Sequence, residues 1–216
     1  MPSRNHSLSD NSNAGNFTDL HTLSRRRASS ARRFGPVGTV FCIGRPVFRS
    51  QIARDLALLL DLDPAVTAWS CLPAVVELAS ADGEIVNHVP DFRVVGSEGR
   101  ESFLDAGETG LTPIGPTITY RTIPEDEIRV EPALANAREM MRYAKRVVPL
   151  GDRVRLLAYL EEMSPITLIE AASAMRESPE PIGAVVALAL KRVIALEWRE
   201  TPIGPETQVR SRCRQN

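Results

Sequence analysis

The chain has 216 residues, of which 43% are hydrophobic and 25% charged, and its formal net charge is −1. This composition is typical of a globular protein. The length suits one medium domain, or one domain with a small appended one. Because no run of about 18 apolar residues occurs, we expect no membrane span and no membrane partner. Cys42, Cys71 and Cys213 lie far apart without CxxC spacing, which argues against a disulfide framework or a zinc motif and favours a reducing compartment such as the cytoplasm.

The first 34 residues are rich in Ser, Asn and Arg and contain few large apolar side chains. Such a segment buries too little surface to offset the entropy of ordering it, so we predict a disordered basic arm over 1–34. A targeting peptide is the alternative, and the acidic residues of the segment count against it. Arg25, Arg26 and Arg27 are candidates for contacting nucleic-acid phosphates, unless the arm is only a solvated tail.

A mixed α/β domain is predicted over residues 37–148. Ser50 is a good N-cap for a helix that ends before Pro64, and apolar residues recur on one face of that helix. Two hairpins follow, the first across the Asp82-Gly83 turn and the second through a Gly-rich turn. The predicted elements are a strand at 37–43, a helix at 51–62, and strands at 66–71, 74–79, 84–89, 91–95 and 101–105.

The second half of this domain begins with a stretch rich in Gly and Pro, with one strand at 117–123. A helix is predicted over 132–147, with a proline at its first position. Four basic residues recur at helical spacing and would make one basic face: Arg138, Arg142, Lys145 and Arg146. This face is a candidate contact for DNA phosphates, and the alternative is a solvated face that pairs with acidic residues of the body.

Residues 152–210 predict a small winged-helix domain, which consists of three helices followed by a two-stranded wing. The three expected N-caps are Asp152, Ser164 and Ser178. The third helix begins with an acidic and apolar stretch, which favours docking to a protein over reading of bases. The last segment, 211–216, is a basic tail whose arginines are able to meet phosphates.

The stretch from His88 to Glu108 reads HVPDFRVVGSEGRESFLDAGE. Asp91 begins one strand and Asp105 ends the next, so their carboxylates can face each other across the hairpin. Nucleases of the PD-(D/E)xK type hold Mg²⁺ between two such carboxylates, and the metal activates water beside the phosphate. Asp91 and Asp105 are therefore the candidate catalytic and metal-binding residues. His88 precedes them, but a lone histidine on a strand is usually structural.

Several stretches resemble the N-terminal nuclease domain of TnsA-type transposon endonucleases. They are LLLDLDPAV at 58–66, Pro73, the Pro-Asp-Phe triplet at 90–92 and the strand that ends at Asp105, and the resemblance covers about residues 45–147. It implies a restriction-endonuclease-like mixed sheet with flanking helices. It also implies a subunit that works beside a transposase and docks onto partners through its C-terminal region.

The chain departs from that family at two catalytic positions. Gly107 stands where the family has its lysine, and Ala53 stands at the expected position of a metal-binding glutamate on the helix. Arg93 lies near Asp91 but is a poor substitute, because an arginine does not release its proton in a protein. The loss of one preorganised electrostatic group costs about 10²–10³-fold in rate, so we expect an impaired site.

The favoured function is therefore a catalytically impaired, TnsA-like protein of bacterial DNA transactions, which acts as a DNA-binding or assembly subunit beside a transposase-type partner. Such a protein would be cytoplasmic, and associated with the nucleoid if it binds DNA. Two alternatives stay open. One is an active Mg²⁺-dependent endonuclease with a relocated catalytic base, for which Lys145 and Glu108 are candidates. The other is a protein-interaction or regulatory module without a DNA role. Magnesium is the one candidate cofactor.

Overall fold

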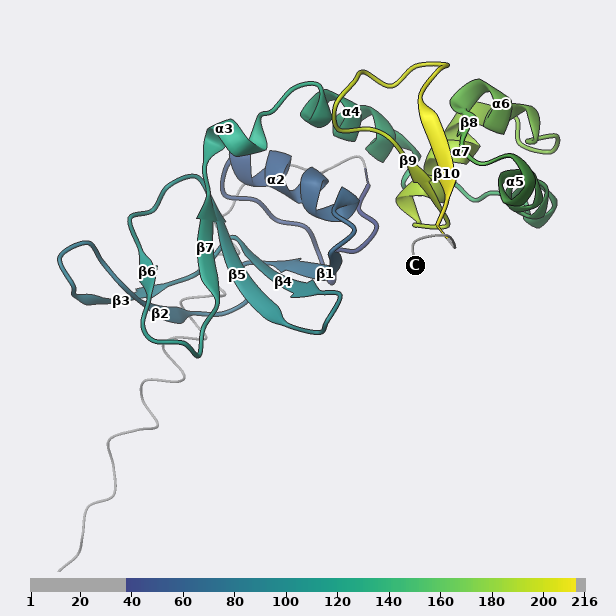
Figure 1. Cartoon of the computed structure of the whole chain (residues 1–216). Coiled ribbons are helices and arrows are strands. Elements are labelled where there is room, and N and C mark those ends of the chain that lie inside the picture. The colour runs from purple at the N-terminus through teal and green to yellow at the C-terminus, as the bar shows by residue number, and fades with distance from the viewer. Residues whose placement is uncertain (1–37, 213–216) are drawn as a thin grey trace, which may run out of the picture.

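The structure is a computed structural model that describes residues 38–212. They form an elongated molecule with most strands at one end and most helices at the other (Figure 1). The fold is mixed α/β, with a mixed sheet and flanking helices, as predicted. The arm at 1–34, with Arg25, Arg26 and Arg27, and residues 213–216 of the tail lie outside the described residues. No helix within 38–212 is long and apolar enough to cross a membrane.

The main sheet has four strands in the order β1-β4-β5-β7. Strand β4 is antiparallel to both of its neighbours, β1 and β5, whereas β7 joins β5 in parallel. Phe92 lies opposite Leu104 in the β4–β5 hairpin, which brings the preceding Asp91 towards Asp105. The four strands are β1 (Val66–Cys71), β4 (Phe92–Gly96), β5 (Glu101–Ala106) and β7 (Tyr120–Ile123).

Helix α2 (Gln51–Leu62) packs on this sheet, and its buried face joins Trp69, Phe92 and Leu104 in one hydrophobic cluster. The predicted cap is confirmed, because the Ser50 side chain accepts from the N–H of Ala53. A one-turn helix that the sequence did not suggest, α3 (Glu125–Ile128), follows β7 and closes the same cluster with a fully buried Ile128.

A second sheet has the order β3-β2-β6. The predicted hairpin across Asp82-Gly83 is present, and Gly83 has a φ of +82°, which a glycine adopts without strain. In place of the strand predicted at 37–43, the described part of that segment shows one isolated bridge, between Cys42 and Trp69. The strands are β2 (Val76–Ala79), β3 (Ile85–His88) and β6 (Thr112–Pro113).

The helix predicted over 132–147 is shorter than expected. Helix α4 (Ala133–Met140) gives way to a 3₁₀ turn, η1 (Met141–Tyr143). Met141 and Ala144 are buried there, and this packing overrides the helical spacing of the charged residues. The four basic residues therefore do not share one helical face.

The C-terminal region contains the three helices and the two wing strands in the predicted order, with β8 as a third strand in a sheet of order β8-β10-β9. Its elements are α5 (Leu150–Met163), β8 (Ile166–Thr167), α6 (Leu168–Ser173), α7 (Pro181–Leu190), β9 (Ile194–Leu196) and β10 (Gln208–Ser211). The winged-helix assignment itself, like the nuclease-like one, stays a prediction.

The three N-caps predicted in this region are wrong. The positions are held by Pro149, Thr167 and Glu180. Thr167 forms a capping box with Glu170, because both its side chain and its backbone N–H find partners there. Asp152 and Ser178 instead bind each other, since the Ser178 hydroxyl donates to the Asp152 carboxylate over 2.6 Å.

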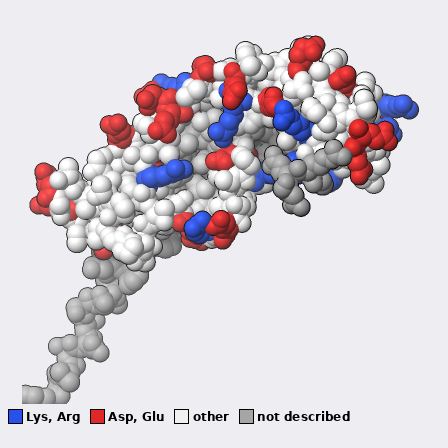
Figure 2. Space-filling view, in the orientation of Figure 1, with Lys and Arg blue, Asp and Glu red and all other residues white. Residues whose placement is uncertain are grey.

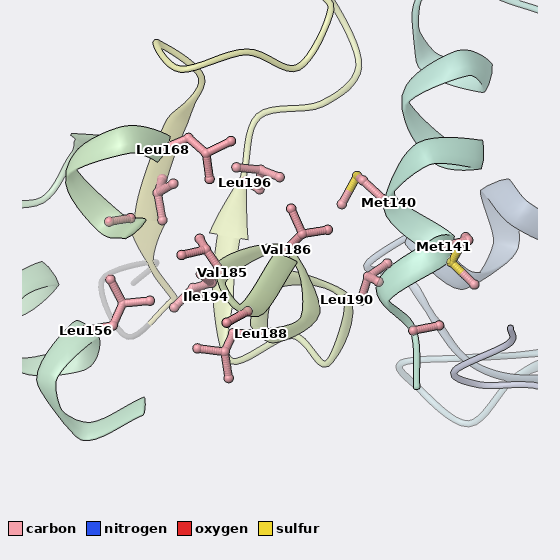
Figure 3. Close-up of a cluster of buried hydrophobic side chains, with 14 of the residues drawn as sticks. Met140, Met141, Leu156, Leu168, Val185, Val186, Leu188, Leu190, Ile194 and Leu196 are labelled. Atoms are coloured by element: carbon pink, nitrogen blue, oxygen red, sulfur yellow. The ribbon is translucent and has the colours of Figure 1, made fainter. Parts of the chain in front are cut away.

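The hydrophobic core of the C-terminal region reaches back into earlier elements. Leu58 of α2 and the buried side chains of α4 pack into the same cluster as α5, α6 and α7. Figure 3 shows Met140 facing Val186 and Leu190 of α7, whereas Met141 points away from α7 on the other side of the chain. Residues on both sides of the predicted boundary near 149–151 therefore share one core.

Candidate functional site

The two acidic residues singled out by the sequence meet where the β4–β5 hairpin ends. The backbone N–H of Asp91 donates to Oδ1 of Asp105 over 2.9 Å, and the N–H of Ala106 donates to Oδ2 of Asp91 over 3.0 Å. Both side chains are buried, with 8% of Asp91 and 2% of Asp105 exposed. Two carboxylates this close and this buried need a positive partner.

That partner is the guanidinium of Arg49. Its Nε donates to Oδ1 of Asp91 over 2.8 Å, and its Nη2 donates to Oδ1 of Asp105 over 2.7 Å. The arginine fork presents parallel donors that match carboxylate oxygens, and charge-assisted bonds of this kind are the strong ones. Because 28% of the Arg49 side chain is exposed, the pair lies at the edge of the fold rather than in its centre.

The residues on either side of Arg49 hold it in place. Phe48 is buried and its ring lies 6.3 Å from that of Phe92, at the start of β4. Ser50 is the N-cap of α2 and is fixed by its bond to Ala53. The backbone of Arg49 is thus anchored both to the strand that follows Asp91 and to the helix above it.

His88 and Tyr120 complete the hydrogen bonding of the inner carboxylate. Nε2 of His88 lies 2.6 Å from Oδ2 of Asp105, and the Tyr120 hydroxyl donates to the same oxygen over 2.7 Å. The hydroxyl of Thr109 lies 2.8 Å from that of Tyr120. His88 at the end of β3 is therefore part of the site, where it and Tyr120 orient Asp105.

The surroundings shift the pKa values of the two acids in opposite directions. Burial favours a higher pKa for Asp105, but the hydrogen bonds from His88 and Tyr120 outweigh burial, and the pKa falls below its ordinary value. Burial raises the pKa of Asp91, and the bond from Arg49 offsets this only in part. The pKa of the Tyr120 hydroxyl is raised, first by burial and then by its bond to Asp105. Asp105 is thus the more firmly ionised acid.

The arrangement does not fit a Mg²⁺ ion between Asp91 and Asp105. All four carboxylate oxygens already accept hydrogen bonds from protein donors. Magnesium requires near-octahedral oxygen ligands at about 2.0–2.1 Å, and the guanidinium of Arg49 lies against one oxygen of each acid, where a shared ion would have to bind. In the described part of the chain, no group of three or more His, Cys, Asp and Glu side chains is placed to hold a metal. Arg49 supplies the positive charge at this position.

The two positions where the chain departs from the nuclease pattern serve the backbone and the core of the fold. Gly107 has a φ of +89° and its N–H donates to the carbonyl of Ile123, so it ends β5 as a backbone feature. Ala53 is fully buried in the core under α2. Among the hydrogen bonds and ion pairs that residues 38–212 make to Asp91 and Asp105, none comes from a lysine.

The predicted basic residues of the α4 region are largely paired with acids. Arg138 lies 3.1 Å from the buried carboxylate of Asp55, and Arg142 lies 3.0 Å from Glu139. Arg146 pairs with Glu180, and Arg93 pairs with Glu101 on the sheet. On the face shown in Figure 2, basic and acidic side chains alternate rather than forming one basic surface. The pairing lowers the charge that these arginines offer to a phosphate.

Sequence reasoning missed Arg49 and Tyr120. A signal existed for the first, because two buried carboxylates without a lysine or a metal-binding glutamate leave negative charge that needs a cation. Nothing in the sequence chooses Arg49 over Arg45, Arg54 or Arg93. Tyr120 gave no signal, because its contact with Asp105 arises from the parallel pairing of β5 with β7, which places Tyr120 opposite Phe103.

Comparisons with known proteins do not assign the chain to a family. No protein-family model matches the chain, and no curated protein matches it in sequence.

Proposed function

We propose that the chain is a non-cleaving, TnsA-like protein that acts in DNA transactions as a DNA-binding or assembly subunit beside a transposase-type partner. The observation that carries this proposal is the bridge from Arg49 to both Asp91 and Asp105. A nuclease of the resembled type needs these two carboxylates for a metal ion. Here an internal cation satisfies them, which supports a scaffold role over a hydrolytic one.

The proposed DNA contact rests on the basic arm more than on the body. Arg25, Arg26 and Arg27 are consecutive and their stretch lacks acids, so their charge is not opposed by sequence neighbours. The α4-region arginines, in contrast, would have to exchange ion pairs with Glu139 or Glu180 for ion pairs with phosphates. We therefore assign the larger electrostatic contribution to the arm and a smaller one to Arg142, Lys145 and Arg146.

The C-terminal region is the proposed docking element for a protein partner. The first helix of this region begins beside three exposed apolar side chains, of which Val147 is 85%, Leu150 74% and Val154 57% exposed. Leu150 and Val154 are four residues apart on α5 and therefore share a face. Exposed apolar side chains that lie together are typical of protein contacts, which agrees with the acidic and apolar start of α7.

The experiment is a supercoiled-plasmid assay on the full chain, with Mg²⁺ and with Mn²⁺, in which retardation and nicking are read on the same gel. We expect retardation without nicking, and we expect retardation to weaken as salt rises because phosphate contacts release counter-ions. Replacing Arg25, Arg26 and Arg27 by Ala should weaken retardation more than Arg142→Ala does.

Two other outcomes of the plasmid assay would each favour one of the alternative functions. Nicking that disappears in Asp91→Asn would favour the alternative, an active endonuclease with a relocated base. The absence of both retardation and nicking would favour the second alternative, a protein-interaction module without a DNA role, and would direct the search to partners of the C-terminal region.

A further inference from the structure

A pocket of about 190 Å³ lies at the junction between the end of α2 and the α7–β9 segment. It shares no residue with the carboxylate site. Its walls combine apolar and polar groups. Figure 3 shows Met140, Leu190, Ile194 and Leu196, from α4, α7 and β9, in the buried cluster beside it. The remaining lining residues include Leu62 and Pro64, Trp198, and the charged side chains of Asp61, Arg192 and Arg212.

The one acid of this pocket is already engaged by other groups. The carboxylate of Asp61 accepts from the backbone N–H groups of Val40 and Phe41, over 3.0 and 2.9 Å, and from Nε1 of Trp69 over 2.7 Å. It is 1% exposed, which places it behind the pocket wall rather than at the mouth. Asp61 therefore acts as a structural acceptor and forms no ion pair with either arginine of the pocket.

The two arginines carry positive charge without a carboxylate partner. Arg192 stacks on the ring of Phe41 at 3.7 Å from its centroid and donates to the carbonyl of Asp63 over 2.8 Å. Arg212 donates to the carbonyl of Arg192 over 3.3 Å, which places the two residues side by side. Within 38–212, no Asp or Glu oxygen lies within the ion-pair limit of 4.0 Å of either guanidinium.

The backbone of Arg192 adds a second argument. Its φ is +58°, a left-handed conformation at the end of α7 where glycine is the usual residue. A long charged side chain at such a position is retained at a conformational cost. Burial, and after it the nearby charge of Arg212, lowers the pKa of the Arg192 guanidinium, and the attraction of Asp63 and Asp61 offsets this only in part.

We propose that this pocket binds a phosphate monoester with an aromatic body, such as a nucleotide. The phosphate would lie between Arg192 and Arg212, because two guanidiniums match a dianion with several acceptor oxygens. The aromatic body would lie against Trp198 and the apolar part of the wall. The ligand is either a free mononucleotide or the 5′-phosphate end of a DNA strand. This proposal does not rest on the function proposed above.

The test is a calorimetric titration of the full chain with phenyl phosphate, and with inorganic phosphate and phenol as its two halves. We expect saturable binding of phenyl phosphate at least about tenfold tighter than that of either half, because only the whole ligand uses both the charge and the wall. Arg212→Gln should weaken phenyl phosphate binding about tenfold, the effect of losing one charge-assisted contact.

Arg210→Gln is the matched control. Arg210 lies two residues before Arg212, pairs with Glu197 at 2.7 Å and does not line the pocket. We expect its substitution to change phenyl phosphate binding less than about twofold, as for a surface ion pair. Both arginines are exposed, so neither variant should alter the fold.

The proposal is overturned if inorganic phosphate binds as tightly as phenyl phosphate, if nothing binds saturably, or if Arg210→Gln weakens binding as much as Arg212→Gln. Titration with adenosine 5′-monophosphate and with one oligonucleotide carrying either a 5′-phosphate or a 5′-hydroxyl then identifies the source. Preference for the 5′-phosphorylated strand supports a DNA end, and preference for the free nucleotide supports a small-molecule ligand. Plasmid retardation without binding of phenyl phosphate would contradict this proposal but would still support the proposed DNA role.

Discussion

Arg49 gives the two buried carboxylates of the site a counter-ion from within the chain. Asp91 and Asp105 would each be costly to bury alone, and together they would repel each other. The guanidinium bonds both, and His88 and Tyr120 engage the remaining oxygen of Asp105. Arg49 thus holds one oxygen of each carboxylate and sets the geometry of the pair.

Removing this cation should cost stability. We expect Arg49→Ala to lower the free energy of unfolding by about 2–4 kcal/mol, because it leaves two buried carboxylates without their partner. Denaturant unfolding at neutral pH measures the change. Arg93→Ala is the control on the same sheet, since its ion pair with Glu101 is exposed on both sides, and it should lower the free energy of unfolding far less than Arg49→Ala does. Equal losses in the two variants would contradict the role assigned to Arg49.

The carboxyl group of Asp152 should make the free energy of unfolding depend on pH. Burial favours a higher pKa for this carboxyl, but bonds from Ser178, the N–H of Glu177 and Arg155 lower it from 3.8 to about 2. A lowered folded-state pKa stabilises the fold above the unfolded value, and this stabilisation is lost as the pH falls from 3.8 through about 2.

We therefore expect Asp152→Asn to destabilise the fold by about 1–3 kcal/mol at pH 6, with a smaller difference from wild type below pH 3. Urea unfolding across this pH range measures the effect. Glu162→Gln, at an exposed position of the same helix, is the control and should change little at either pH. A difference between Asp152→Asn and wild type that does not depend on pH would count against the linkage.

At the scale of elements, the close packing of α7 against the ring of Tyr143 explains why position 183 is a glycine. A Cβ on Gly183 would lie 2.5 Å from Cε1 of Tyr143, in the turn that follows α4. Gly183 is the third residue of α7, and glycine has a lower helix propensity than alanine. At position 183 the missing side chain lets α7 pack closely against η1. The packing of these two elements, rather than helix propensity, therefore explains the glycine.

Gly183→Ala should consequently destabilise the fold by about 1–2 kcal/mol, because overpacking exceeds the gain in helix propensity. Thermal unfolding of the purified variant is a sufficient measurement. Gly204→Ala is the control, since nothing lies within 4 Å of the added Cβ there, and it should stay within about 0.5 kcal/mol of wild type. A stabilised Gly183→Ala variant would contradict the close packing.

The elements also show what the sequence could predict. The hairpin at Asp82-Gly83, helix α2 with its Ser50 cap, and the β4–β5 hairpin all followed from local patterns, because turn residues and capping side chains act within a few positions. The end of α4 and the caps of the C-terminal helices did not, because they depend on tertiary contacts. Met141 is buried in a core that it shares with α2 and α7, and Ser178 bonds to Asp152, 26 residues earlier. The acids of the site were found by their motif, whereas Arg49 depends on tertiary placement.

At the scale of the whole molecule, the strand-rich end and the helical end are joined by packing rather than by a linker. Leu58 of α2 and the residues of α4 belong to the C-terminal core, and Arg192 of the C-terminal region stacks on Phe41. The molecule in Figure 1 is long, but its hydrophobic contacts run across its middle. The regions predicted as two domains are thus coupled.

Calorimetric unfolding of the full chain should therefore show one cooperative transition. The shared core means that unfolding of either end exposes apolar side chains of the other. Trp69 lies in the strand-rich core and Trp198 packs against the C-terminal core, so the fluorescence of Trp198→Phe and Trp69→Phe variants reports each end separately. Two midpoints that differ by more than the error of the measurement would show that the ends unfold independently.

The most direct test of the central claim is the binding of Mn²⁺ to the wild-type chain, measured by electron paramagnetic resonance of the free ion. Manganese has the oxygen preference of magnesium and reports its own binding. If Arg49 satisfies Asp91 and Asp105, wild type and Asp91→Asn should leave the same amount of Mn²⁺ free. One equivalent of Mn²⁺ bound by wild type and lost in Asp91→Asn would contradict the account, because the carboxylate pair would then be a metal site.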